Sequence, residues 1–141
     1  MPIAHFHLVR DHYSTAQIGE LLTAASRAYS QVLESPMERV RAFAHLYDPD
    51  TVAVAGELVS AGAAPAPFFT AFVLAGRPVE QRDRLLAALT DTVIEVLGAD
   101  RASIRGQIIQ LDPGDWGIGG VPASTTRAGE IAARASVASR S

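Results

Sequence analysis

Two matching stretches decide the fold of this chain, Pro2-Ile3-Ala4-His5-Phe6-His7-Leu8-Val9 and Pro67-Phe68-Phe69-Thr70-Ala71-Phe72-Val73-Leu74. Each is a short apolar run that opens with proline. This is typical of a buried strand, because proline at the first residue of a strand removes no ladder hydrogen bond. The second run starts 65 residues after the first, at position 67 against position 2. An internal repeat of this kind predicts two copies of one structural unit.

A helical pattern follows each of these strands. Ser14 and Gln17 have the spacing of a capping box, and apolar residues recur at helical spacing across residues 18–32. In the second half the same spacing covers residues 85–97, and Gly98 is placed to cap the end of that helix. Both halves therefore predict a strand followed by a helix.

A further strand is expected after each helix, at residues 39–46 and 103–110. Arginine occupies the third position of both segments, as Arg41 and Arg105. A helix between two strands predicts that the strands are parallel, with a right-handed connection. Two such units predict a mixed α/β (α+β) fold, a four-stranded sheet with two helices on one face. The other face needs cover, so we expect an oligomer.

The chain is expected to form one domain, residues 1–141. It is divided into a first β-α-β unit at 1–59, a linker at 60–66, a second unit at 67–121 and a C-terminal tail at 122–141. Turn-rich segments at 48–56 and 112–120 predict short hairpins. The tail is expected to hold a short helix at 128–135.

Composition excludes several classes of protein. The chain has 48% hydrophobic residues and a net charge of -3, so neither disorder nor a basic nucleic-acid-binding surface is indicated. It has no cysteine, which excludes disulfides and thiolate chemistry. Arg10, Asp11 and His12 interrupt the apolar start, and no apolar run is long enough to span a bilayer. We expect a cytoplasmic protein with no membrane or nucleic-acid partner.

Pro2 is a candidate catalytic residue. A small second residue permits removal of Met1, which would leave a secondary amine at the chain end. An α-amino group has a pKa of about 8 in model peptides, and desolvation or a nearby cation lowers that pKa. Such an amine is suited to general base catalysis at neutral pH. From the residues alone, a purely structural proline that opens a strand is the favoured interpretation.

The pattern resembles the tautomerase superfamily. The opening from Pro2 to Leu8 is similar to that of 4-oxalocrotonate tautomerase, and the second half resembles that short enzyme along nearly its whole length. The similarity there rests on Gly76-Arg77, Leu97-Gly98, Ser103-Ile104-Arg105 and Trp116-Gly117-Ile118-Gly119-Gly120, which occur in family order. The chain resembles a fused, double-length member, similar in layout to malonate semialdehyde decarboxylase and cis-3-chloroacrylic acid dehalogenase. This resemblance implies a homotrimer.

The resemblance also implies an activity. It suggests a cofactor-independent keto-enol tautomerase for small 2-hydroxydienoic or 2-oxo carboxylic acids, with Pro2 as the general base and acid. Arg77 would bind the substrate carboxylate or its carbonyl oxygen. Arg41 or Arg105 would stabilise developing charge, and Trp116 would form an apolar wall. The alternatives for these residues are surface or intersubunit ion pairs for the arginines and intersubunit packing for Trp116.

Departures from the family pattern leave other functions open. His12 stands where the short tautomerases have an arginine, and Tyr29 and Leu74 replace the helix histidine and an extra arginine of the dehalogenase. Tyr29 is a candidate substrate-binding residue at that helix position. Glu38 falls where the decarboxylase has a water-activating acid, so a hydratase or decarboxylase is one alternative. Ala75 replaces an arginine of that family and counts against it. A catalytically silent trimeric scaffold is another alternative, because fold alone does not fix function.

The remaining motifs add no further chemistry. Pro67 is internal, so its nitrogen is acylated and is not a base. His5 and His7 alternate on one strand and are interpreted as packing or interface groups, and we expect no metal site and no cofactor. The sequence does not identify the substrate, nor which of the two strand arginines serves the site.

Overall fold

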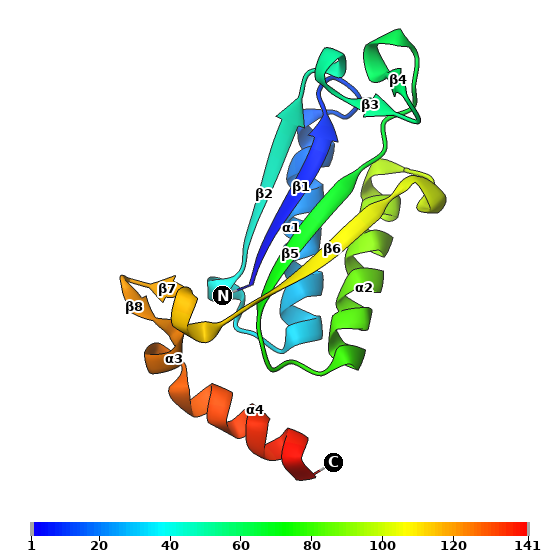
Figure 1. Ribbon diagram of the computed structural model, residues 1–141. Helices are drawn as coiled ribbons and strands as arrows, with labels where there is room; N and C mark the ends of the chain where they lie inside the picture. Colours follow the sequence, from blue (N-terminus) through cyan, green and yellow to red (C-terminus); the bar gives the residue numbers. More distant parts are fainter. Residues whose placement is uncertain (1, 141) are drawn as a thin grey trace.

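The computed structural model describes residues 2–140, with side chains described as far as residue 137 (Figure 1). The first unit consists of strand β1 (Ile3–Val9), helix α1 (Thr15–Leu33) and strand β2 (Arg41–Tyr47). The second consists of strand β5 (Phe68–Leu74), helix α2 (Val79–Leu97) and strand β6 (Arg105–Leu111). The predicted repeat is therefore a repeat of β-α-β units.

The four long strands form one sheet in the order β2-β1-β5-β6. Strands within each unit are parallel, whereas β1 and β5 meet antiparallel at the centre, with Ile3 opposite Phe72. The expected fold class is confirmed. The outer strands start two residues later than predicted, because short 3₁₀ turns, η1 (Met37–Arg39) and η4 (Arg101–Ser103), precede them.

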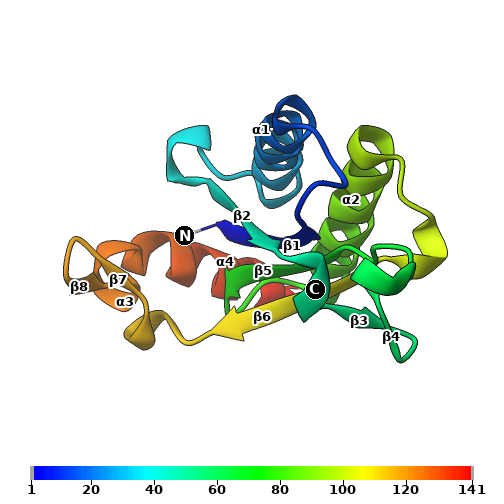
Figure 2. The same cartoon turned by 90° about the horizontal axis from the view of Figure 1, so that it is seen from above.

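Both helices cover the same face of the sheet (Figure 2). The predicted capping box is present at the start of α1, where the backbone N–H of Gln17 donates to Ser14 Oγ over 3.1 Å. Gly98 ends α2 in the left-handed conformation, with φ of 68°. The core between helices and sheet is filled by large side chains that are almost fully buried: Phe6, Leu21, Tyr29, Phe69, Leu85 and Leu89.

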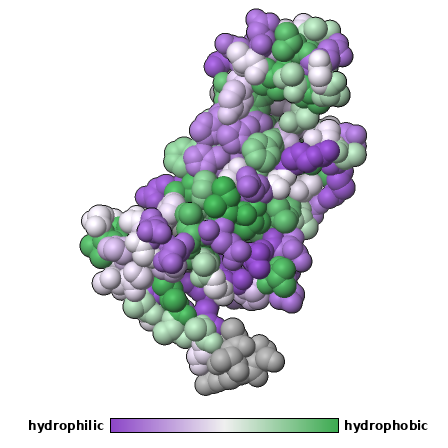
Figure 3. Space-filling view, viewed as in Figure 1, coloured by the Kyte–Doolittle hydropathy of each residue, from purple (hydrophilic) through white to green (hydrophobic). Residues whose placement is uncertain are grey.

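The opposite face of the sheet is not covered within the chain. The side chains that β1, β2 and β5 present there include His5, His7, Phe43, His45, Tyr47 and Phe68. Phe43 is 45% exposed and Phe68 is 37% exposed. Figure 3 views this side, and hydrophobic side chains gather over the strands in it. No helix in the described part of the chain is long and apolar enough to cross a membrane.

Two short hairpins lie at opposite ends of the sheet (Figure 1). The first pairs β3 (Ala53–Val54) with β4 (Glu57–Leu58), and the second pairs β7 (Gly117–Ile118) with β8 (Val121–Pro122). Short turns η2 (Pro49–Thr51), η3 (Val59–Ala61) and η5 (Pro113–Asp115) lead into or out of them.

Two helices follow the second hairpin, α3 (Ala123–Thr126) and α4 (Ala128–Arg140). The predicted tail helix is therefore longer than the expected 128–135. In Figures 1 and 2, α4 lies at the end of the sheet where β1 begins.

Candidate active site

The antiparallel pairing of β1 with β5 brings Pro2 and Arg77 to the same end of the sheet. Pro2 precedes the first residue of β1, and the register sets it beside the last residues of β5. The chain leaves β5 through Gly76, whose φ of 110° favours glycine, and reaches Arg77 before α2 begins. Residues 75 positions apart in the sequence thus share one site, and both line one small cavity of about 20 Å³.

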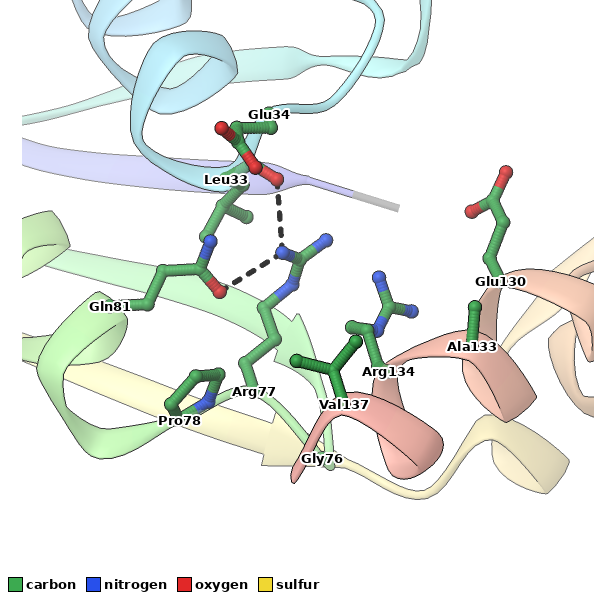
Figure 4. A pocket seen from close by; sticks show the side chains of 10 residues that line it. All are labelled: Leu33, Glu34, Gly76, Arg77, Pro78, Gln81, Glu130, Ala133, Arg134 and Val137. Atoms are coloured by element: carbon green, nitrogen blue, oxygen red, sulfur yellow. Dashed lines mark hydrogen bonds between the residues drawn. The ribbon is translucent and has the colours of Figure 1, made fainter. Parts of the chain in front are cut away.

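The Arg77 guanidinium is held in place by backbone and side-chain oxygens. Its Nη1 donates to Leu33 O over 3.0 Å and to Gln81 Oε1 over 3.1 Å (Figure 4). Gln81 Nε2 in turn donates to Val32 O over 3.0 Å. This chain of hydrogen bonds ties the start of α2 to the end of α1. Arg77 is therefore a fixed donor whose orientation does not depend on a ligand.

Burial and a second cation weaken the hold of Arg77 on its proton. Desolvation and then the neighbouring charge of Arg134 lower the pKa of Arg77 to about 10. Tyr29, Glu130 and Glu34 act in the opposite direction. The guanidinium remains charged at neutral pH. Two guanidiniums placed close together in a partly buried site favour an anion between them.

A larger cavity of about 570 Å³ opens beside Arg77. One wall is formed by Leu33, Glu34, Gly76, Arg77, Pro78 and Gln81, and the other by Glu130, Ala133, Arg134 and Val137 of α4 (Figure 4). It shares Leu33, Arg77, Glu130 and Arg134 with the small cavity at Pro2, so the two are adjoining parts of one site. Its volume is in the range of small-molecule sites.

Helix α4 is held against this site by an ion pair. Arg39 Nη1 and Nη2 donate to the two carboxylate oxygens of Glu130, each over 3.0 Å. This bidentate hydrogen bond lowers the pKa of Glu130 and raises that of Arg39. Such parallel geometry is the stronger form of an arginine–carboxylate pair. It connects the turn before β2 to the C-terminal helix.

Tyr29 lies in the core beneath this end of β1. It has no exposed surface, and its hydroxyl donates to the backbone oxygens of Phe72 and Ile3. Desolvation raises the pKa of Tyr29. Tyr29 lines neither cavity, and its hydrogen bonds join β1 and β5 next to Pro2. Within one chain, its effect on the site is to fix the strands.

The other predicted site residues lie on exposed surfaces. The backbone N–H of Arg41 donates to Pro2 O over 2.9 Å, whereas the Arg41 side chain is exposed. Arg105 is opposite Phe68 at the other end of the sheet, roughly 17 Å along the strands from Pro2. Trp116 is half-buried before β7, and Glu38 is exposed in η1. None of these four lines the two cavities, so a single chain brings together only Pro2 and Arg77 of the predicted set.

Sequence reasoning missed the charged residues that η1, α4 and the residue before α4 bring to Pro2. These are Arg39, Arg127, Glu130 and Arg134. Positions 127, 130 and 134 are spaced at i, i+3 and i+7, which places them on one face of a helix. That spacing was the available signal. Across residues 2–140, no group of three or more histidine, cysteine or carboxylate side chains is arranged to hold a metal ion.

Comparisons with known proteins identify relatives of this chain. A family model described as tautomerase enzyme matches residues 67–126. A 2-hydroxymuconate tautomerase of Comamonas testosteroni is 35% identical over 57 residues, which are 40% of this chain and 90% of that protein. Such relatives have the length of one β-α-β unit of this chain.

Double-length relatives are found among solved structures. A fused 4-OT, solved as a symmetric trimer, is 31% identical with a TM-score of 0.79, covering 88% of this chain and 98% of that one. A protein inactivated by 2-oxo-3-pentynoate is 25% identical with a TM-score of 0.82 over the same shares of both chains. The chain therefore belongs to the tautomerase family and has the fused, double-length layout of these structures.

Proposed function

We propose that the chain is a cofactor-independent keto-enol tautomerase for 2-hydroxydienoic or 2-oxo carboxylic acids, with Pro2 as its general base and acid. The observation that carries this proposal is the meeting of Pro2 and Arg77 in one cavity. Membership of the tautomerase family supports it. The proposal requires removal of Met1, a residue outside those that the structure describes.

In the proposed reaction a proton moves from oxygen to carbon with no net change in composition. The free amine of Pro2 takes the proton of the 2-hydroxyl group and returns it to a carbon of the conjugated chain. Arg77 binds the adjacent carboxylate or oxygen and stabilises the negative charge that develops on the dienolate. Its fixed hydrogen bonds to Leu33 O and Gln81 Oε1 support this role, because a preoriented donor needs no reorganisation during the reaction.

A homotrimer is proposed on two grounds. One fused 4-OT relative was solved as a symmetric trimer, and the sheet of this chain has an uncovered face with exposed Phe43 and Phe68. Because Arg105 is at the far end of its own sheet from Pro2, we propose that it serves the site of another copy, with Arg41 or Trp116 as further contributors at that interface. The cytoplasmic location stays a prediction from sequence.

The hydratase or decarboxylase alternative gains no support from the geometry. It needs Glu38 to activate water, and Glu38 is exposed and lines neither cavity of its own chain. We therefore treat this alternative, together with the silent scaffold, as outcomes of the experiment below.

The first test measures ketonisation of 2-hydroxymuconate by ultraviolet absorbance, together with the intact mass of the protein. We expect the mass to lack Met1. Pro2→Ala should lower kcat/KM by about 100-fold or more, because general acid–base catalysis typically contributes about 10²–10⁴. Pro67→Ala is the matched control, since Pro67 opens the corresponding strand of the repeat but carries no free amine. It should retain kcat.

Other outcomes separate the alternatives. A processed terminus without turnover of the enol, but with hydration or decarboxylation of an unsaturated or 3-oxo acid, would favour the Glu38-dependent function. A retained Met1 with no activity would favour the scaffold. 2-Oxo-3-pentynoate, which inactivates a similar protein, offers a direct probe, because a free amine can add to its electron-poor triple bond.

A further inference from the structure

Helix α4 lies beyond the part of the chain that the family model matches. The match ends at residue 126, and α4 begins at Ala128. The fused relatives are covered over 98% of their own length while covering 88% of this chain, so part of this chain is additional to them. What α4 adds to the site is therefore a property of this chain and not of the matched region.

Two arginines meet the site at this end of the chain, Arg127 at the residue before α4 and Arg134 within α4. Arg127, Glu130 and Arg134 all line the cavity that contains Pro2 and Arg77. Both oxygens of the Glu130 carboxylate already accept a hydrogen bond from Arg39. Glu130 is the one carboxylate among the described residues lining this small cavity, so its arginines are left with an excess of positive charge. The larger cavity is lined by Glu34 as well as Glu130, and of these two carboxylates Glu130 is already paired with Arg39.

Two of these guanidiniums have unused hydrogen-bonding capacity. Arg134 makes no hydrogen bond or ion pair with any residue that the structure describes, although it lies close enough to Arg77 to affect its proton affinity. Arg127 Nε is buried and has no hydrogen-bond partner among the side chains and backbone that the structure describes. An unpaired buried donor is costly, and a bound anion or water molecule would satisfy it.

The two cations face one space from opposite walls. Figure 4 shows the guanidiniums of Arg77, at the start of α2, and Arg134, on α4, pointing into the cavity between these elements. Arg77 has been assigned to the reacting end of the substrate. An acid that fills the cavity of about 570 Å³ would then bring its far end to Arg134.

We propose that Arg134 is a specificity-determining residue that binds a second anionic group of the substrate, so that the site prefers dianionic over monoanionic acids. This inference rests on the proposed function for the identity of the reacting end. The Arg39–Glu130 ion pair positions the helix that carries Arg134 and acts through it. Arg127, next to Pro2, adds to the positive potential without a direct role in this selection.

Binding can be tested without turnover. Adipate and hexanoate have the same chain length and differ in the second carboxylate, so their dissociation constants, measured by titration calorimetry on the full-length protein, isolate its contribution. We expect the wild type to bind adipate more tightly. Arg134→Gln should weaken adipate by about tenfold or more, the loss of one hydrogen bond between charged groups, and leave hexanoate unchanged. Arg134→Lys should restore part of the preference.

Arg101→Gln is the matched control, because Arg101 is an exposed arginine that pairs with Asp91 at η4. It should change neither constant. The melting temperature of each variant separates undocking of α4 from loss of the contact. Equal weakening of adipate and hexanoate in Arg134→Gln, or a wild type that binds neither acid or does not prefer adipate, would overturn the inference.

Turnover separates this inference from the proposed function. With 2-hydroxymuconate as the dianionic substrate and phenylenolpyruvate as the monoanionic one, Arg134→Gln should raise KM for the first alone and leave kcat for both nearly unchanged. If the wild type turns over neither substrate yet shows an Arg134-dependent preference for adipate, the inference stands and the tautomerase proposal fails. If the wild type turns over both substrates and Arg134→Gln changes KM for neither one selectively, the inference is wrong and the tautomerase proposal stands.

Discussion

At the scale of single residues, the site depends on a proline and an arginine that have separate duties. Pro2 is buried at the start of β1, which suits a desolvated amine, and Arg77 is fixed by Leu33 O and Gln81 Oε1. In the proposed reaction the amine of Pro2 carries the proton, and the cation of Arg77 stabilises the negative charge that the proton leaves behind. The division makes the effects of substitutions at the two positions distinguishable.

Two substitutions of Arg77 should reduce catalysis to different extents, because one removes the positive charge and the other keeps it. Arg77→Ala removes the donor and should lower kcat/KM about 10- to 150-fold, since hydrogen bonds to charged groups contribute roughly 1.5–3 kcal/mol. Arg77→Lys keeps the charge but loses the fork-like geometry, so we expect an intermediate loss. Steady-state kinetics with 2-hydroxymuconate measure both. Arg84→Lys, an exposed site on α2, is the control, and equal activity of all three variants would exclude Arg77 from the reaction.

At the scale of elements, close packing between β5 and β6 depends on one glycine. A Cβ placed on Gly106 would lie 2.3 Å from the ring of Phe69, which is fully buried in the core. No side chain fits there unless the ring moves. The requirement for glycine is particular to the second unit, since β2 has Ala42 where β6 has Gly106.

Gly106→Ala should therefore destabilise the protein by overpacking, by about 1–3 kcal/mol. Gly19→Ala is the matched control, because nothing lies within 4 Å of a Cβ at this position of α1. That change should stabilise the protein by up to about 1 kcal/mol through helix propensity. Urea unfolding measures both free energies. A neutral Gly106→Ala would mean that Phe69 relaxes without cost.

The repeated elements were predictable because their signals are local. Ser14 with Gln17 specifies the start of α1, Gly98 specifies the end of α2, and proline marks the strand that opens each unit. The strand ends were less predictable, since the turns η1 and η4 are set by backbone hydrogen bonds, such as Val40 N–H to Met37 O over 3.0 Å. No period in the sequence encodes such turns.

At the scale of the whole molecule, the uncovered face of the sheet carries a ladder of aromatic and histidine rings. His5 Nδ1 and His45 Nε2 are 2.6 Å apart, and His7 Nδ1 is 2.6 Å from Tyr47 Oη. The rings of His5 and His7 both stack on His45, with Phe43 and Phe68 beside them. Protonation of these rings would place like charges in contact.

The strands that form this face carry basic side chains and no acidic ones. Arg41 and Arg105 also lie on strands of the sheet, and none of the four strands contains aspartate or glutamate. Desolvation and then the charge of His45 lower the pKa of His5, and the same causes with the charge of His5 lower that of His7. Added protons on the ladder would therefore meet no compensating carboxylate from the sheet.

Acid should destabilise the folded protein through this ladder. Because the pKa values of His5 and His7 are lowered in the folded state, the unfolded chain binds more protons once the pH falls below about 6.5, and stability is lost as the pH falls from there through the folded pKa values. Unfolding free energies at pH 7.5 and 5.5, at fixed protein concentration, measure the loss. The His5→Gln, His7→Gln double variant should flatten this dependence.

His12→Gln is the control, since His12 is exposed in the loop after β1 and lies outside the ladder. It should leave the pH dependence unchanged. A double variant that keeps the full acid sensitivity would assign that sensitivity to other groups. If the uncovered face joins copies of the chain, the trimer should also dissociate over the same pH range, which sedimentation would detect.

The site was only partly predictable, because its remaining residues meet through long-range contacts. Pro2 and Arg77 each belong to a recognisable family motif. The pairing of Arg39 with Glu130 joins positions 91 residues apart, and no local pattern specifies such a contact. Arg105 lies far from Pro2 in its own chain because β5 runs antiparallel to β1 and β6 runs parallel to β5, so β6 begins at the end of the sheet opposite Pro2.

The most direct single test of the central claim, that Pro2 acts through a free amine, is peptide mass analysis after treatment with 2-oxo-3-pentynoate. We expect a terminus without Met1 and one adduct on the peptide that begins with Pro2, formed in step with the loss of 2-hydroxymuconate turnover. An unmodified amino-terminal peptide in a protein that has lost its activity, or a fully active protein that retains Met1, would contradict the role of Pro2.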